Sequence, residues 1–243
     1  MPNCPQHRLV TSIFLHLYPG FFILALYLLL VPLTSSIGYP PLLALMASAL
    51  IVLVGLELGH LVREGYKLNG ALSLKGVVLY KKKTKPLPFL TVTLGSVMLA
   101  FLLFGLTQPT DAFLLRALFS WLPDWYIYTD LEAFKAYPRQ VLIVTFTLRL
   151  LLDGLVFPTI EELYYRGYLQ PRLSRFGHYA PLISHSLFTL YHVWQPWNYP
   201  TILLAVLPLA YAAWWKQDYR LAVAIHCALN VLGGVLTMLA VLS

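Results

Sequence analysis

Residues 140–158 read QVLIVTFTLRLLLDGLVFP and lead directly into residues 159–166, which read TIEELYYR. The first part is long and apolar enough to cross a bilayer, because a membrane span needs about 20 mostly apolar residues. The second part carries two adjacent carboxylates and an arginine. Ionised groups at membrane depth cost at least about 2.5 kcal/mol each, so they usually mark a transport pathway or a reaction centre. This stretch therefore predicts a membrane helix that carries a functional site.

The whole chain has the composition of a membrane protein. Of its 243 residues, 59% are hydrophobic and only 11% are charged, and the mean hydropathy is +0.70. A soluble domain needs more polar surface than this. The net charge of +7 comes from basic residues spread over loops between apolar segments. This pattern indicates orientation signals and contacts with anionic lipids, so the bilayer is the expected partner and nucleic acid is not.

The apolar segments predict an all-α, polytopic transmembrane helical bundle of about seven to eight helices, with the polar site on the C-terminal helices. The expected spans are 13–33, 41–62, 87–106, 140–158, 180–195, 200–215 and 221–242. Residues 159–175 predict a less apolar helix that lies partly in the membrane. Residues 112–122 predict a separate interfacial amphipathic helix, with Pro109 near its start. We expect 1–243 to form one integral membrane domain, with the core that carries the polar site in 140–243 and N-terminal helices in 1–139.

Charge placement predicts the orientation of the chain. The loop 63–86 holds Arg63, Lys67, Lys75, Lys81, Lys82, Lys83 and Lys85. Such loops stay on the cytoplasmic side, so the N-terminus is expected to be cytoplasmic as well. The tryptophans at 194, 197, 214 and 215 are expected at span ends, in an aromatic belt. We expect an integral protein of the plasma (inner) membrane of a prokaryote. Cys4 in the tail and Cys227 in an apolar helix predict no disulfide.

The charged motif divides into two parts by helical geometry. Residues four apart share a helix face, so Glu162 and Arg166 are expected to form an ion pair. Adjacent residues diverge by about 100°, so Glu161 points elsewhere. This arrangement leaves Glu161 free to act as a base.

Two further polar motifs follow in apolar segments. His226 and Asn230 are four apart, so one helix face offers an imidazole and a carboxamide that can donate to a developing oxyanion. His192 stands four residues after Phe188, which is expected to pack beneath it. Glu161 and His192 together can hold a water molecule and take its proton. These residues predict amide hydrolysis without a covalent intermediate.

The motifs Glu-Glu-x-x-x-Arg, Phe-x-x-x-His and His-x-x-x-Asn occur here in this order on successive expected helices. Together they resemble the CPBP family (CAAX protease and bacteriocin-processing), which includes CAAX endopeptidases that trim prenylated proteins and bacterial abortive infection homologues. The resemblance covers roughly residues 140–243. It implies a glutamic intramembrane endopeptidase that acts on a membrane-anchored protein or peptide without a cofactor.

Carried over by position, the resemblance implies that Glu161 and His192 activate the water. It implies that His226 and Asn230 form the oxyanion site, with Glu162 and Arg166 in supporting roles. The chain departs from the family at Pro196, because eukaryotic CAAX enzymes often carry a polar residue four after the second motif's histidine. This departure leaves hydrolysis intact and the prenylation state of the substrate open.

Two other functions fit the same residues. Glu161, His192 and His226 can supply three ligands to a catalytic zinc ion, with water in the fourth position. Alternatively, the chain is a non-enzymatic membrane regulator or immunity protein, whose polar residues hold helices together.

Several polar residues outside the motifs have structural interpretations. Arg149 and Asp153 are four apart and are expected to form a salt bridge that borders the site. A structural hydrogen bond is expected for His185. Glu57 and His60 are expected to lie near the membrane interface.

Overall fold

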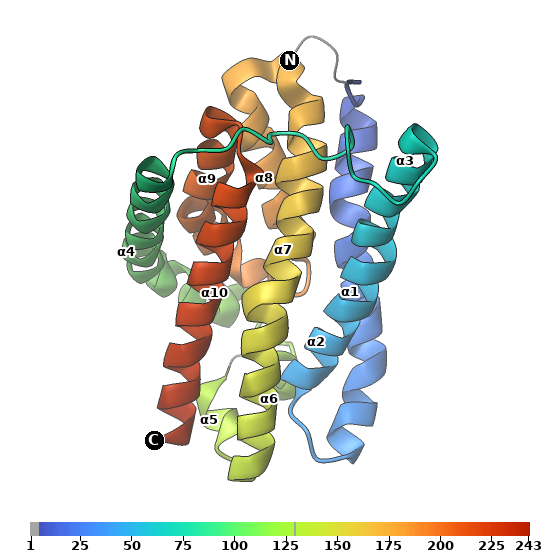
Figure 1. Ribbon diagram of the computed structural model, residues 1–243. Coiled ribbons are helices and arrows are strands. Elements are labelled where there is room, and N and C mark those ends of the chain that lie inside the picture. The colour runs from blue at the N-terminus through green and yellow to red at the C-terminus, as the bar shows by residue number, and fades with distance from the viewer. Residues whose placement is uncertain (1–4, 129) are drawn as a thin grey trace.

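A computed structural model of the chain describes residues 5–128 and 130–243. Cys4 lies outside the described residues. Within the described part the fold is helical, with isolated β-bridges and no extended strand, and the helices pack as one bundle (Figure 1). The prediction of an all-α helical bundle is confirmed.

The bundle is built from long helices, some of which are joined end to end by π-helical turns. The helices are α1 (Leu9–Ser36), α2 (Pro41–Val52), α3 (Gly59–Asn69), α4 (Pro86–Leu118), α5 (Leu131–Phe134), α6 (Arg139–Leu151), α7 (Phe157–Glu162), α8 (Ala180–Tyr191), α9 (Tyr199–Lys216) and α10 (Tyr219–Leu242). The π-helical turns are η1 (Leu53–Leu58), η3 (Leu152–Val156) and η4 (Leu163–Leu169). The 3₁₀ segments are η2 (Asp124–Tyr126), η5 (Gln170–Tyr179) and η6 (Pro196–Asn198).

Several of these helical segments can cross a bilayer. Among the described residues, five are long and apolar enough: Leu9–Ser36, Pro41–Asn69, Pro86–Leu118, Arg139–Tyr191 and Tyr219–Leu242. Their outward faces carry many exposed leucine, phenylalanine and valine side chains, as contact with lipid requires. The chain is an integral membrane protein.

The predicted separate helix at 112–122 is wrong, because α4 continues from Pro86 to Leu118 through Pro109. Proline removes one backbone hydrogen bond, but its φ angle is compatible with a helix. A helix can therefore continue through a proline when contacts with a neighbouring helix stabilise it. Here the hydroxyl of Thr201 on α9 bonds to Thr107 and to Asp111, on either side of the proline. These contacts hold both halves of α4 against α9.

The predicted boundary between residues 158 and 159 is also absent. The chain runs helically from Arg139 to Leu169 through α6, η3, α7 and η4. Pro158 lies in the first turn of α7, directly after the π-helical turn η3. A π-helical turn changes the backbone hydrogen-bonding pattern, so the helix tolerates the N–H that proline lacks. The kink comes later, at Gly177, whose φ of 57° and ψ of −127° suit glycine.

The aromatic-belt prediction is wrong for two of the four tryptophans. Trp194 and Trp197 are only 7% and 3% exposed, whereas Trp215 is 66% exposed. Helix α8 already ends at Tyr191, and the following connection, residues 192–198, packs against core residues. Because α8 ends early, Trp194 and Trp197 lie inside the protein and His192 is partly buried beside them.

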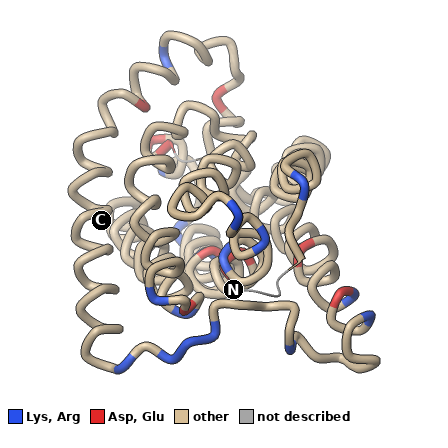
Figure 2. Tube along the Cα trace, turned by 90° about the horizontal axis from the view of Figure 1, so that it is seen from above, with Lys and Arg blue, Asp and Glu red and all other residues tan. Residues whose placement is uncertain are grey.

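Residues 76–84 form a strap across one end of the bundle, and α1 begins at the same end (Figure 1). Leu79 donates its backbone N–H to the carbonyl of Gly167, and Lys82 donates to that of Gln217. Figure 2 looks down on this end, where basic residues run along the edge. The side of the membrane that it faces stays a prediction from the charges.

Asp218 fastens the strap to the turn between α9 and α10. Its carboxylate accepts hydrogen bonds from the Thr84 backbone and from the Arg220 guanidinium at 2.6–2.9 Å. Burial raises the pKa of Asp218, but these hydrogen bonds outweigh it and hold the pKa below its usual range.

Helix α1 packs closely against the end of α8. A Cβ atom at Gly20 would lie 2.0 Å from the carbonyl oxygen of Tyr191, which is backbone and cannot rotate away. We expect Gly20→Ala to lower the free energy of unfolding by about 1–3 kcal/mol or more through overpacking. Thermal unfolding of the purified protein measures this. Gly95→Ala is the control, because no atom lies within 4 Å of its added Cβ; an equal loss in both variants would contradict the close contact.

Candidate active site

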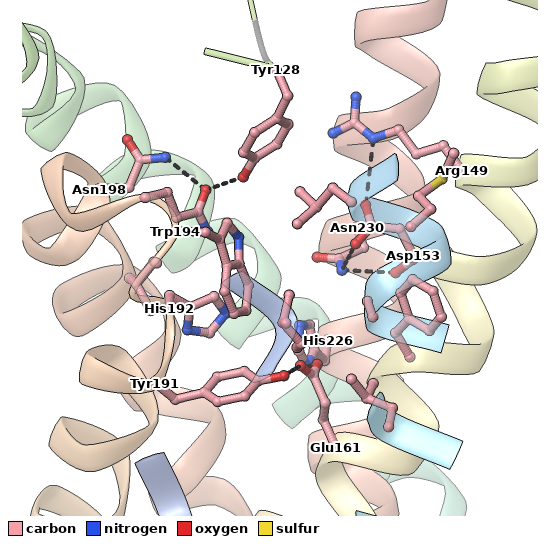
Figure 3. Close-up of a pocket in the computed structure, with 18 of the residues that line it drawn as sticks. Tyr128, Arg149, Asp153, Glu161, Tyr191, His192, Trp194, Asn198, His226 and Asn230 are labelled. Carbon is pink, nitrogen blue, oxygen red and sulfur yellow. Dashed lines mark hydrogen bonds and ion pairs between the residues drawn. The ribbon is translucent and has the colours of Figure 1, made fainter. Parts of the chain in front are cut away.

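The residues predicted to be catalytic surround one cavity of about 320 Å³. Glu161 reaches it from α7, His192 from the end of α8, and His226 and Asn230 from α10 (Figure 3). Phe188 also lines the cavity, whereas Glu162 and Arg166 lie behind its wall. The structure therefore brings the predicted residues of three separate helices together.

Glu162 and Arg166 form the ion pair expected from their spacing. The Arg166 Nη1 lies 3.1 Å from the Glu162 Oε1, and both side chains are fully buried. The same oxygen accepts a second hydrogen bond, from His226 Nδ1 at 2.8 Å. Spacing within one helix did not indicate this contact between α7 and α10. Glu162 thus orients the His226 ring and leaves its Nε2 free of this contact.

Arg166 is held by further contacts. Its Nη2 donates to His185 Nδ1 at 3.0 Å, so the neutral His185 ring donates from Nε2 to the Ile202 carbonyl at 3.0 Å. The structural hydrogen bond expected of His185 is confirmed. The guanidinium lies over the Phe188 ring, 4.2 Å from its centre. This cluster gives the cavity a rigid base.

His192 has a fixed ring orientation. Its Nδ1 donates to the Phe188 carbonyl at 2.8 Å, because a carbonyl oxygen can only accept. In the neutral imidazole, Nε2 is then an acceptor. The Phe188 and His192 rings pack edge to face with their centres 4.8 Å apart, as the sequence predicts. His192 therefore presents a hydrogen-bond acceptor beside the cavity.

Glu161 has different partners from its neighbour Glu162. Its Oε1 accepts a hydrogen bond from the Tyr191 hydroxyl at 3.3 Å, and its Oε2 lies 4.0 Å from His226 Nδ1. Glu161 is 8% exposed, whereas Glu162 is fully buried. The two carboxylates are thus separated as helical geometry predicts. Tyr191 was not expected at the site, although it directly precedes His192 in the sequence.

Asn230 lines the cavity, but its amide group is hydrogen-bonded to η3, the turn between α6 and α7. The Nδ2 atom donates to the Asp153 backbone carbonyl at 2.8 Å and to the Asp153 Oδ1 at 3.3 Å. Asp153 also accepts from Arg149 Nε at 3.4 Å, which confirms the predicted salt bridge. Arg149, Asp153 and Asn230 therefore form a chain of contacts along one wall of the cavity (Figure 3).

The interface position predicted for Glu57 is wrong. Glu57 is fully buried, and its Oε1 accepts a hydrogen bond from the Tyr165 hydroxyl at 3.2 Å. His60 bonds instead to the Tyr168 hydroxyl at 3.1 Å. The polar tyrosines of η4 make the burial of Glu57 possible.

Known proteins were compared with the chain. Residues 143–232 match the family described as "Type II CAAX prenyl endopeptidase Rce1-like". Neither the curated proteins nor the solved structures yielded a significant match to the chain. The matched region begins in α6 and ends in α10, so it contains all four residues that the sequence predicts as catalytic. Over residues 143–232 the chain is therefore similar to the CAAX protease family of membrane endopeptidases, which supports the resemblance that the three motifs carry.

Proposed function

We propose that this protein is a glutamic intramembrane endopeptidase that hydrolyses a peptide bond in a membrane-anchored protein or peptide. The observation that carries the proposal is the meeting of Glu161, His192, His226 and Asn230 around one cavity in a lipid-embedded bundle. The matched family name describes a prenyl endopeptidase, and a prenylated substrate is one chemical form that fits the proposal.

In the proposed reaction, Glu161 and the His192 Nε2 hold a water molecule. The water oxygen attacks the scissile carbonyl carbon while its proton passes to Glu161. The proton then moves to the leaving amine as the C–N bond breaks. His226, held by Glu162, stabilises the oxyanion, and Asn230 assists once substrate displaces part of its contact with Asp153.

The His192 geometry supports this assignment. A base must present a free lone pair within reach of the proton that it accepts. The Nδ1 contact with Phe188 places the proton of the neutral ring on that atom, so the lone pair is on Nε2. Tyr191 steadies the Glu161 carboxylate without supplying a positive charge.

The proposal includes an orientation. The start of α1 and the basic strap lie at one end of the bundle, and we place this end in the cytoplasm by the positive-inside rule. The proposed location is the plasma (inner) membrane of a prokaryote.

A zinc protease is the second candidate, because both histidines already bond through Nδ1 to an oxygen, as zinc-binding histidines usually do. Against it, no three His, Cys, Asp or Glu side chains in the described part of the chain gather as a metal site.

The experiment measures peptide release from a prenylated, membrane-anchored peptide by the protein in lipid nanodiscs. We expect the chelator 1,10-phenanthroline to leave the rate unchanged.

The control compound in that experiment is 1,7-phenanthroline, an isomer that does not chelate metal ions. Loss of activity with the chelator alone, restored by added zinc, would replace the glutamic mechanism with the zinc mechanism. Metal analysis of the same purified sample would then show about one zinc ion per chain.

A further inference from the structure

Glu57 is a fully buried carboxyl group that the proposed hydrolysis does not use. It lies in η1, and Leu53 of the same segment lines the cavity. The Glu57 Oε1 lies 3.2 Å from the Tyr165 hydroxyl, whereas Oε2 has no hydrogen-bond partner among the described residues. Among the same residues, no lysine, arginine or histidine forms an ion pair with Glu57. A buried carboxylate without a cation is so costly that such groups usually take up a proton.

The hydrogen bonds around the Tyr165 hydroxyl give a second reason for a proton on Glu57. The hydroxyl oxygen lies 3.2 Å from both the His16 carbonyl oxygen and the Glu57 Oε1. A tyrosine hydroxyl has one hydrogen, so these two oxygens share it when Glu57 only accepts. With a proton on Oε1, Glu57 donates to the Tyr165 oxygen while Tyr165 donates to His16. Each contact then has its own hydrogen, and the unbonded Oε2 is a neutral carbonyl oxygen, which is less costly to bury than an ionised one.

Tyr165 connects Glu57 to the candidate base. The Tyr165 and Tyr191 side chains are both fully buried, and their ring centres lie 5.4 Å apart. Tyr191 donates its hydroxyl hydrogen to Glu161 Oε1 at 3.3 Å, as Figure 3 shows. Closely packed buried rings do not shift independently, so the position of the Tyr165 hydroxyl affects that of Tyr191. The contacts therefore run from η1 through η4 and α8 to α7.

Two other carboxyl groups lie near Glu57. The segment η1 packs directly against α7, and Glu161 and Glu162 at the end of α7 act on Glu57 electrostatically. Glu162 is already paired with Arg166. A third negative charge at this place would oppose the ionised Glu161 that the proposed reaction requires. A neutral Glu57 supplies a hydrogen-bond donor without this repulsion.

We propose that Glu57 is a neutral carboxylic acid that positions the Glu161 carboxylate through Tyr165 and Tyr191. Glu57 does not line the cavity, so it positions the base and does not itself exchange protons with the substrate. This role rests on the proposed function, because Glu161 is the base of that reaction. Of the volume, the charge and the hydrogen-bond donor of the Glu57 side chain, the donor is the feature that hydrolysis requires.

Two variants of Glu57 distinguish the donor from the charge. Glu57→Gln has a neutral side chain of nearly the same shape, and its amino group can donate to Tyr165. Glu57→Leu has a similar volume but no donor. Hydrolysis of the prenylated, membrane-anchored peptide is measured in nanodiscs. We expect Glu57→Gln to keep kcat within about twofold of the parent, and Glu57→Leu to lower kcat by about 10- to 100-fold with little change in KM, as misplacement of a catalytic group does.

The matched controls are Glu64→Gln and Glu64→Leu, because Glu64 lies in the next helix, α3, and pairs with the exposed Lys67. Both should keep kcat. Thermal unfolding of each variant measures folding. Equal losses of kcat in Glu57→Gln and Glu57→Leu would show that hydrolysis requires the charge, and full activity of Glu57→Leu would show that it does not require the donor. Either result would overturn the proposal.

A third variant keeps the test decisive if Glu57→Leu does not fold. Tyr165→Phe removes the connecting hydroxyl and keeps the ring that packs against Tyr191. It should lower kcat as Glu57→Leu does, again with little change in KM. Full activity of Tyr165→Phe would overturn the proposal, because no hydrogen bond would then connect Glu57 to the site.

Infrared difference spectroscopy tests the proposal without turnover. The parent spectrum minus that of Glu57→Gln, at neutral pH, should contain the carbonyl stretching band of a protonated carboxylic acid. Carboxylate bands in its place would overturn the proposal. The bands of Glu161 are obtained in the same way with Glu161→Gln. They should shift in Glu57→Leu and Tyr165→Phe and stay in place in Glu57→Gln; bands that stay in place in all three variants would overturn the positioning role.

The same spectra separate the role of Glu57 from the proposed function. If the parent shows the expected bands and shifts but releases no peptide, Glu57 positions Glu161 and the endopeptidase is contradicted. If the parent hydrolyses the peptide through Glu161 and the Glu161 bands do not shift in Glu57→Leu, the endopeptidase stands and the role of Glu57 is overturned.

Discussion

Glu161→Gln is expected to lower the rate of peptide hydrolysis by about 10²- to 10⁴-fold, the usual contribution of a general base. The amide has nearly the same shape as the carboxylate and can still accept the hydrogen bond from Tyr191, but it cannot take a proton from water. The measurement is the initial rate of product release by purified protein in nanodiscs.

Thermal unfolding is the control for Glu161→Gln. Within the described residues, the ion-pair contact of Glu161 is the 4.0 Å separation between its Oε2 and His226 Nδ1, so loss of the charge should cost little stability. Its midpoint should stay within a few degrees of the parent. Glu132→Gln is the matched substitution, since Glu132 is exposed and 78% of its side chain surface is accessible. If Glu161→Gln hydrolysed the peptide as fast as Glu132→Gln, Glu161 would have no part in the mechanism.

Arg166→Met is expected to lower the free energy of unfolding by about 3–5 kcal/mol, because it leaves the buried Glu162 carboxylate without its cation. It also removes the contacts with His185 and the Phe188 ring. Since Glu162 and Phe188 position His226 and His192, activity should fall together with stability. Thermal unfolding and denaturant titration in detergent measure the change.

A double variant tests whether the loss comes from the unpaired charge. Arg166→Met with Glu162→Gln removes both charges, so it should be more stable than Arg166→Met alone. Arg139→Met is the control, because the Arg139 side chain is exposed and, among the described residues, bonds to the Leu242 carbonyl alone. A double variant no more stable than the single one would show that packing, and not charge, determines the cost.

Much of the fold was predictable from hydropathy and helical spacing. The apolar segments indicated the membrane bundle, and spacing of four predicted the pairs Glu162–Arg166 and Arg149–Asp153. These contacts are local, so the regular geometry of one helix determines them. The continuity of α4 through Pro109 was not predictable, because it depends on Thr201 of a different helix.

The missed features of the candidate site depend on contacts between helices. The bond from His226 to Glu162 joins residues 64 positions apart, and the bond from Asn230 to Asp153 joins residues 77 apart. Nothing in the local pattern indicates which partner each side chain meets. The burial of Trp194 likewise follows from the early end of α8, which hydropathy placed at residue 195.

The central claim is that Glu161 serves hydrolysis and Glu162 serves structure. The most direct measurement compares the termini of membrane proteins, by mass spectrometry, in cells that produce either the parent protein or Glu161→Gln at equal levels. The account predicts at least one processed terminus that is present with the parent and absent with the variant. Identical termini in both cells, together with full biological function of the variant, would contradict the account and favour a non-enzymatic membrane regulator or immunity protein.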